Sequence, residues 1–172
     1  MEEFLNPEKI LKKLNLKEDQ IAVDFGSGSG GWVIPLAKIL TKGKVFAVDI
    51  LKEPLSALKS RAKLERLVNI FTVEADVEKP LPLASNLADL ILMTNLLFEV
   101  DNKEAVFKEA KRILKKDGKI LVVDWKEDSP IGPEKKVSIK DIREIAQKEG
   151  FSLEKEFPAG KFHFALIFSK IK

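Results

Sequence analysis

The chain has 172 residues, of which 45% are apolar and 33% charged, with no Cys, one His and a formal net charge of +3. This length predicts one domain, residues 1–172, with one sizeable core. The lack of Cys excludes disulfides, thiolate metal sites and cysteine nucleophiles, and a single His excludes a histidine-rich metal cluster. No apolar run approaches the roughly 20 residues that span a bilayer, so we expect a cytoplasmic protein without a membrane span.

The 30 basic and 27 acidic side chains are mixed along the chain, which favours an ordinary solvated surface over nucleic-acid binding. One basic cluster closes a predicted helix, where cations offset the helix dipole: Lys111, Arg112, Lys115 and Lys116. We therefore expect no nucleic-acid partner. The high share of Lys and Glu, with Gln only at 20 and 147, favours the hypothesis of a thermophilic source.

Secondary structure follows a regular alternation along the chain. Asn6 and Pro7 predict the start of a short leading helix over residues 6–16. Compact apolar runs predict buried strands over residues 21–25, 45–48, 70–75, 87–93 and 119–124. Helical periodicity predicts helices over residues 32–40, 52–67, 103–114 and 138–148. Strands that alternate with helices imply right-handed crossovers and a parallel sheet.

The C-terminal end departs from this alternation. Residues 151–157 and 161–168 are both strand-like, and only Pro158, Ala159 and Gly160 separate them. Three residues cannot form a parallel crossover, so these strands must form an antiparallel hairpin. The predicted fold class is therefore α/β, with a doubly wound, mostly parallel sheet of seven strands that ends in an antiparallel hairpin. Residues 126–136, rich in Pro, Gly and charge, are expected to be the least ordered stretch.

A glycine-rich segment follows the first predicted strand. Residues 26–31 read Gly-Ser-Gly-Ser-Gly-Gly and satisfy both G-x-G-x-G and G-x-G-x-x-G. Glycines at a strand-to-helix turn permit positive φ and close approach of the backbone to a ligand, and the helix N-terminus adds free N–H groups. A tight turn alone would account for one or two glycines but not for four in six positions. The segment therefore predicts a ligand-binding loop.

Two aspartates end the next two predicted strands. Asp49 follows Gly26 by 23 residues, the position from which a carboxylate can accept hydrogen bonds from both hydroxyls of a ribose. Asp76 ends the third strand at the same edge of the sheet. Each taken singly is also explained as a turn or helix-capping residue. Together with the glycine loop, they predict an adenosine-type ligand at the carboxyl edge.

These segments resemble the motifs of a known family. Residues 23–30, 48–50, 75–77 and 88–95 are similar, in that order, to the motifs of class I S-adenosylmethionine-dependent methyltransferases, and most similar to the ubiquinone/menaquinone-biosynthesis-type branch. Residues 109–119 resemble the segment that leads into that family's fifth strand. The resemblance covers residues 19–170. It implies a Rossmann-like sheet of order 3-2-1-4-5-7-6, with S-adenosylmethionine as cofactor and S-adenosylhomocysteine as its product.

The resemblance also implies which residues contact the cofactor: Asp24, Gly26, Ser27, Gly28, Gly30, Asp49, Ile50, Ala75, Asp76, Val77 and Asn95. The glycine loop would pack on the methionine part, with Asp24 near the ammonium group. Asp49 would hold the ribose hydroxyls, and Ile50 would cover one adenine face. Asp76 would accept from the adenine amino group, with Ala75 and Val77 nearby. Asn95 would line the place of methyl transfer.

The methyl acceptor should lie among residues 94–100, 125–134 and 157–164, which all reach the carboxyl edge. Four side chains are candidates for its pocket: Asn95, Phe98, Trp125 and His163. His163 is also the candidate general base, although its alternation with the neighbouring apolar residues suits an ordinary strand position. Phe98 and Trp125 suit either a pocket or the core.

The motifs leave the acceptor open. Asn95 is not followed by the Pro-Pro-aromatic residues typical of amino-methylating DNA enzymes, and the lack of Cys excludes cysteine-dependent methylation. An oxygen, nitrogen or carbon atom of a small molecule, lipid or protein side chain remains. Two other functions stay as alternatives, an NAD(P)-dependent oxidoreductase and a cofactor-binding partner subunit without activity. Asp76 and the terminal hairpin have no role in the oxidoreductase.

Overall fold

The computed structural model describes residues 4–172 and contains a seven-stranded sheet of order β3-β2-β1-β4-β5-β7-β6. The first five strands pair in parallel, and β7 is antiparallel to both β5 and β6. Their bounds are Ile21–Phe25 (β1), Lys44–Asp49 (β2), Ile70–Glu74 (β3), Ala88–Thr94 (β4), Leu114–Trp125 (β5), Phe151–Pro158 (β6) and His163–Lys170 (β7). The order and the terminal hairpin confirm the predicted Rossmann-like fold class.

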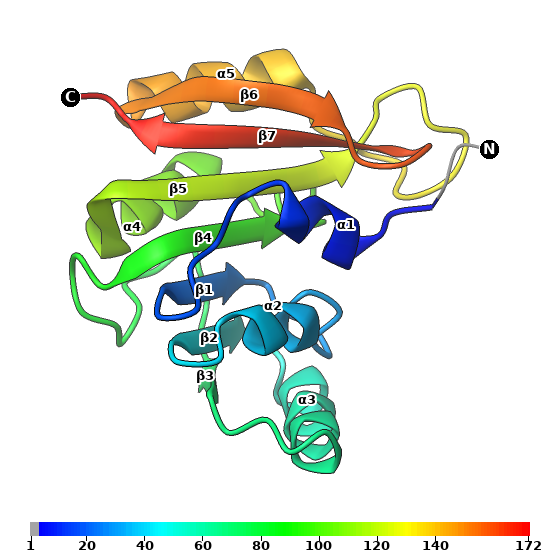
Figure 1. Ribbon diagram of the computed structural model, residues 1–172. Coiled ribbons are helices and arrows are strands. Elements are labelled where there is room, and N and C mark those ends of the chain that lie inside the picture. Colours follow the sequence, from blue (N-terminus) through cyan, green and yellow to red (C-terminus); the bar gives the residue numbers. More distant parts are fainter. Residues whose placement is uncertain (1–3) are drawn as a thin grey trace.

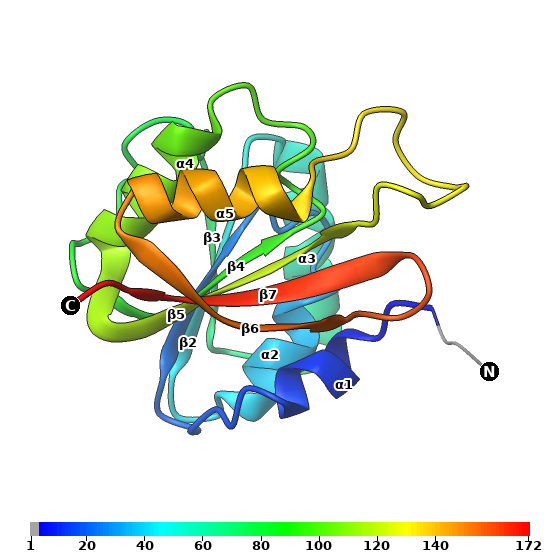
Figure 2. The same cartoon turned by 90° about the horizontal axis from the view of Figure 1, so that it is seen from above.

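Helices cover both faces of the sheet (Figures 1 and 2). The helices are α1 (Pro7–Lys12), α2 (Val33–Ile39), α3 (Lys52–Leu64), α4 (Lys103–Ile113) and α5 (Ile139–Lys148). Residues of α1, α2 and α3 share one apolar core with one face of the strands, and residues of α4 and α5 share a second core with the other face. The central strands are therefore buried on both faces, which explains why they read as continuous apolar runs.

Three element boundaries differ from the sequence prediction by three residues or more. Helix α1 ends at Lys12 instead of residue 16, because Asn15 takes a left-handed backbone conformation (φ 50°). Helix α3 ends at Leu64 for the same reason, with Arg66 at φ 55°. Strand β5 starts directly after α4, at Leu114, whereas the sequence predicts that it starts at residue 119. Its first residues pair with β4 across a register irregularity, which accommodates residues 115–118.

The segment between β5 and α5 contains no helix or strand and extends away from the carboxyl edge of the sheet (Figure 2). At Gly132 within it, φ is 97°, and a Cβ would lie 2.6 Å from the Trp125 ring. The loop therefore passes close over that ring at a position that requires glycine. Among the helices of residues 4–172, none is long and apolar enough to cross a bilayer.

Candidate functional site

The glycine loop joins β1 to α2 at the carboxyl edge of the sheet. The N–H groups of Gly26 and Ser27 both donate to the carbonyl of Val48, at 2.8 and 2.9 Å, so the loop is tied to the end of β2. Gly30 has φ 93°, and a Cβ there would lie 2.4 Å from a methyl group of Leu58. Gly28 also has positive φ, but a Cβ there would meet nothing within 4 Å. Gly30 is thus required by packing, whereas Gly28 borders open space.

Asp49, the last residue of β2, holds this loop in place. Its carboxylate accepts hydrogen bonds from the N–H of Gly28 at 2.8 Å and from the N–H of Leu51 at 2.9 Å. An ionised carboxylate has about four acceptor positions, so two remain for a ligand. The adjacent Ile50 side chain is 62% exposed, an apolar surface beside the same carboxylate.

Asp24 lies in β1, two residues before the loop, and is completely buried. Neither of its carboxylate oxygens has a hydrogen-bond partner among residues 4–172. Burial, and then the negative charge of Asp49, raise the pKa of Asp24 well above its usual range. A buried carboxyl group without partners destabilises a protein. Because Asp24 comes two residues before a glycine loop that borders open space at Gly28, it fits a cationic group that a ligand supplies.

Asp76 follows β3, and its two carboxylate oxygens have different partners. Its Oδ1 accepts from the N–H of Glu78 at 2.9 Å, and its Oδ2 lies 3.9 Å from the ammonium group of Lys79. Ala75 links the ends of β2 and β3, because its N–H donates to the carbonyl of Asp49 at 3.0 Å. Val77 is buried in the core on the α4 face. The ends of β1, β2 and β3 thus form one continuous edge.

Three of the candidate acceptor residues come together farther along this edge. Asn95 follows β4, Trp125 ends β5 and His163 begins β7. His163 Nε2 lies 2.9 Å from Asn95 Oδ1, and the His163 and Trp125 rings are 4.1 Å apart. Burial, and then the charge of Lys126, lower the pKa of His163 to about 4. The fourth candidate, Phe98, is half-buried and packs against the core on the α4 face.

The sequence analysis missed Asp124, the residue before Trp125. Asp124 is fully buried, and its carboxylate accepts from the N–H of Leu97 at 3.1 Å and from the N–H of Trp125 at 2.8 Å. Burial raises the pKa of Asp124 to about 6 despite these hydrogen bonds. Asp124 therefore ties the segment after β4, which contains Asn95, to the end of β5. An acidic residue at the end of an apolar strand, like Asp49, was the available signal.

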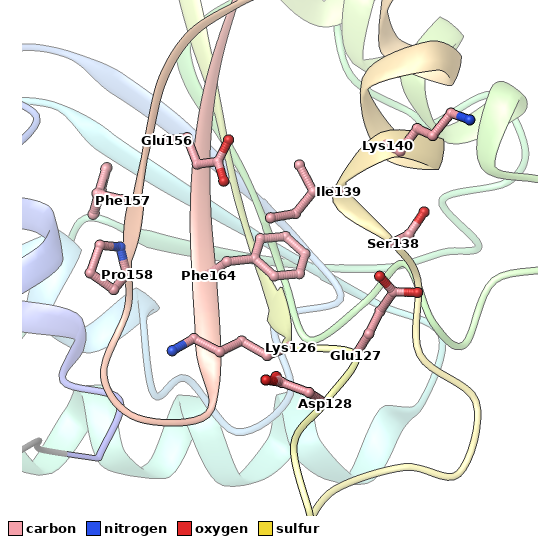
Figure 3. Close-up of a pocket in the computed structure, with 10 residues that line it drawn as sticks. All are labelled: Lys126, Glu127, Asp128, Ser138, Ile139, Lys140, Glu156, Phe157, Pro158 and Phe164. Atoms are coloured by element: carbon pink, nitrogen blue, oxygen red, sulfur yellow. The ribbon is translucent and has the colours of Figure 1, made fainter.

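A groove of about 790 Å³ lies beside this edge, on the face that α5 covers. It is lined by the start of the loop after β5, the start of α5, the end of β6 and the start of β7. Figure 3 shows the Phe164 ring beside Ile139, with charged side chains around them. The groove shares residues 126–128, 157, 158 and 164 with the predicted acceptor region, but Asn95, Trp125 and His163 do not line it.

Comparison with known proteins agrees with this arrangement. A profile of the methyltransferase domain family matches residues 23–122, more than half of the chain, and these residues include the glycine loop, Asp49, Asp76 and Asn95. A demethylmenaquinone methyltransferase of Geobacillus sp. strain WCH70 is 25% identical over 126 residues, which are 73% of this chain and 53% of that protein. The chain thus spans about half the length of the curated relatives it matches.

Two solved structures are similar over nearly the whole chain. A SAM-dependent methyltransferase from Aquifex aeolicus has a TM-score of 0.89 and 28% identity, and the match covers 95% of this chain and 89% of that one. A putative type 11 methyltransferase from Sulfolobus solfataricus has a TM-score of 0.81 and 29% identity, over 99% and 95% of the two chains. The family match, the sheet order and the glycine loop agree, and the chain belongs to the class I S-adenosylmethionine-dependent methyltransferases.

Proposed function

We propose that this chain binds S-adenosylmethionine at the glycine loop and transfers its methyl group to an oxygen, nitrogen or carbon atom of an acceptor. The observation that carries the proposal is Asp24, a fully buried carboxyl group without a partner, two residues before a loop that borders open space at Gly28. The cofactor's ammonium group is the kind of cation that such a carboxyl group lacks.

The other cofactor contacts follow from the acceptor positions that remain free. Asp49 would use its two unoccupied positions for the ribose hydroxyls while it continues to hold Gly28. Ile50 offers an exposed apolar surface for the adenine ring. Asp76 would accept from the adenine amino group through the oxygen near Lys79. In this arrangement the carboxylates set the cofactor's position, and the glycines let its methionine part approach the backbone.

The protein's part in the reaction is mainly to position the reacting atoms. When bound, the cofactor supplies a sulfonium methyl group that is already electrophilic. In-line displacement then requires an acceptor atom about 3 Å from the methyl carbon, opposite the sulfur, with water excluded. Asn95 and the loop after Trp125 lie at the edge where this alignment must occur. We assign them the task of orienting the acceptor.

Titration calorimetry with S-adenosylhomocysteine and with NADH tests cofactor binding. We expect binding of S-adenosylhomocysteine only, and a loss of about 1–3 kcal/mol of affinity in Asp49→Ala, which removes the charge-assisted acceptor and releases Gly28. Asp117→Ala, at an exposed position near the start of β5 and thus at the opposite edge of the sheet, is the matched control. Binding of NADH alone would favour the oxidoreductase instead.

Labelled S-adenosylmethionine with fractions of a cell extract tests the methyl transfer. Transfer of label by the isolated chain supports an enzyme, and the fraction that takes up label identifies the acceptor. A chain that binds the cofactor but transfers no label to any fraction would favour a partner subunit without activity.

A further inference from the structure

Asn95, Trp125 and His163 form a cluster that joins three adjacent strands, and we call it the histidine cluster. Trp125 and His163 are direct partners across the β5–β7 pairing, and their rings lie 4.1 Å apart at an interplanar angle of 39°. The His163 side chain is only 6% exposed. Stacking on one face and burial leave the imidazole little freedom to rotate.

The contact between His163 and Asn95 has a defined polarity. His163 Nε2 lies 2.9 Å from Asn95 Oδ1, and an amide oxygen can only accept a hydrogen bond. With the amide oxygen of Asn95 facing the ring, Nε2 carries the proton and donates it. A neutral imidazole has one N–H group, so Nδ1 keeps its lone pair. The contact thus specifies one tautomer of the only His in the chain.

This hydrogen bond decides which end of the Asn95 amide is available to a ligand. The main chain of Asn95 is also held, with φ 49° and with its N–H donating to the carbonyl of Val123 at 2.8 Å. Within residues 4–172, the Asn95 amide nitrogen makes no hydrogen bond, and it is not among the fully buried unpartnered atoms. Its two N–H groups are therefore accessible, while its oxygen is engaged by His163.

We propose that His163 is a positioning residue that holds the Asn95 amide with its N–H groups toward the methyl acceptor, and that this arrangement selects an acceptor with an oxygen at or next to the methylated atom. The inference rests on the proposed function. An oxygen offers lone pairs to the Asn95 N–H groups, whereas an amine would need the amide oxygen, which His163 occupies. A buried imidazole with a pKa of about 4 is also a weak proton acceptor at neutral pH.

The tautomer can be measured directly, because the chain's only His produces a single set of imidazole signals. Nitrogen-15 NMR of the unliganded full chain should show a protonated Nε2 and an unprotonated Nδ1 between about pH 5.5 and 8. Asn95→Asp replaces the amide oxygen by a carboxylate oxygen at the same place, and it should raise the pKa of His163 by at least about one pH unit.

Asn86→Asp is the matched control for this measurement. Asn86 has the same left-handed backbone (φ 55°), but it precedes β4 at the opposite edge of the sheet. We expect this variant to leave the pKa of His163 unchanged. A protonated Nδ1, or an equal response to both substitutions, would overturn the proposed hydrogen bond. The measurement needs neither cofactor nor acceptor, so it tests the pair separately from the proposed function.

Methyl transfer from labelled S-adenosylmethionine to cell-extract fractions tests the positioning role. His163→Ala should lower kcat about tenfold or more without changing the affinity for S-adenosylhomocysteine. His163→Gln, which retains an N–H donor, should recover part of this loss and keep the wild-type pH profile. If His163 were a general base, the wild-type rate would fall as the imidazole becomes protonated. His163→Gln would then not recover the rate lost in His163→Ala.

The labelled products test the preference for oxygen. We expect label on an oxygen, or on a carbon next to an oxygen-bearing carbon. Label only on amines would refute the preference. A wild-type chain that transfers no label would refute the proposed function and the preference together, while the NMR result would still decide the hydrogen bond.

Discussion

Asp24 and Asp124 are both completely buried, in strands β1 and β5 of the same sheet, yet they differ in their hydrogen-bond partners. The Asp124 carboxylate accepts hydrogen bonds from the main chain at Leu97 and Trp125, whereas neither oxygen of Asp24 has a partner among the described residues. Burial raises the pKa of both. The hydrogen bonds of Asp124 therefore tie the segment after β4 to the end of β5, whereas Asp24 makes no such connection among the described residues.

The largest expected effect is on stability, at Asp124. Asp124→Ala leaves the N–H groups of Leu97 and Trp125 without their acceptor in a buried place, so we expect the free energy of unfolding to fall by about 2–3 kcal/mol. Denaturant titration measures this. Asp128→Ala, exposed in the loop that follows, should change it by less than about 0.5 kcal/mol. Equal stability of the two variants would contradict the role of Asp124.

Asp24→Asn should increase stability, in contrast to Asp124→Ala, and should weaken cofactor binding. The amide keeps the shape of the side chain but removes the buried acid, so the free energy of unfolding should rise by about 1 kcal/mol. The affinity for S-adenosylhomocysteine should fall about 10- to 100-fold, because a charge-assisted hydrogen bond to the ammonium group is lost. Calorimetry and denaturant titration of the same preparation measure both quantities. If Asp24→Asn lost stability and kept its affinity for S-adenosylhomocysteine, the proposed ligand-binding role of Asp24 would be wrong.

The sequence predicts the roles of these two aspartates unequally. Both stand between apolar residues at the end of a predicted strand, and only the resemblance to a family singled out Asp24. The partner of Asp124, the N–H of Leu97, is 27 residues away, and its direction depends on how the chain leaves β4. Whether a buried carboxylate is satisfied is therefore a property of tertiary structure that no local pattern contains.

The fold was more predictable than the site, for a related reason. The alternation of strands and helices and the three-residue turn before β7 are local features, and they are sufficient for the sheet topology. Topology also brought Asn95 and His163 to one edge, as predicted. The hydrogen bond between them joins residues 68 positions apart, and it depends on side-chain directions that the strand pattern does not specify.

Stability between pH 4 and 6.5 should reveal opposite contributions from Asp124 and His163. The folded state raises the pKa of Asp124 from 3.8 to about 6, so its contribution to stability is present below pH 3.8 and is lost as the pH rises through 6. The folded state lowers the pKa of His163 from 6.5 to about 4, so its contribution is present above pH 6.5 and is lost as the pH falls through 4. In the wild type the two trends partly cancel.

Substitutions separate these trends. Relative to wild type, His163→Gln should gain about 1–2 kcal/mol of unfolding free energy as the pH falls from 6.5 to 4.5, since the variant no longer loses the histidine contribution. Asp124→Asn should show the reverse drift. Urea titrations at each pH measure the differences, in which the other titrating groups cancel. If the unfolding free energies of wild type and His163→Gln changed in parallel with pH, His163 would have the same pKa in the folded and unfolded chain.

The smallest expected effect is a pH dependence of cofactor binding that arises from Asp24. Its raised pKa means that the free protein holds a proton on Asp24 to higher pH than an ordinary Asp does, whereas pairing with the ligand's ammonium group favours the ionised form. Binding must then release protons, and the affinity must rise with pH. One proton limits the effect to at most about tenfold per pH unit. Calorimetry in buffers of different ionisation enthalpy counts the released protons. Asp24→Asn should release fewer protons, because its amide has no proton to lose when the ammonium group binds. Equal proton release by the two proteins would mean that the ligand's ammonium group does not pair with Asp24.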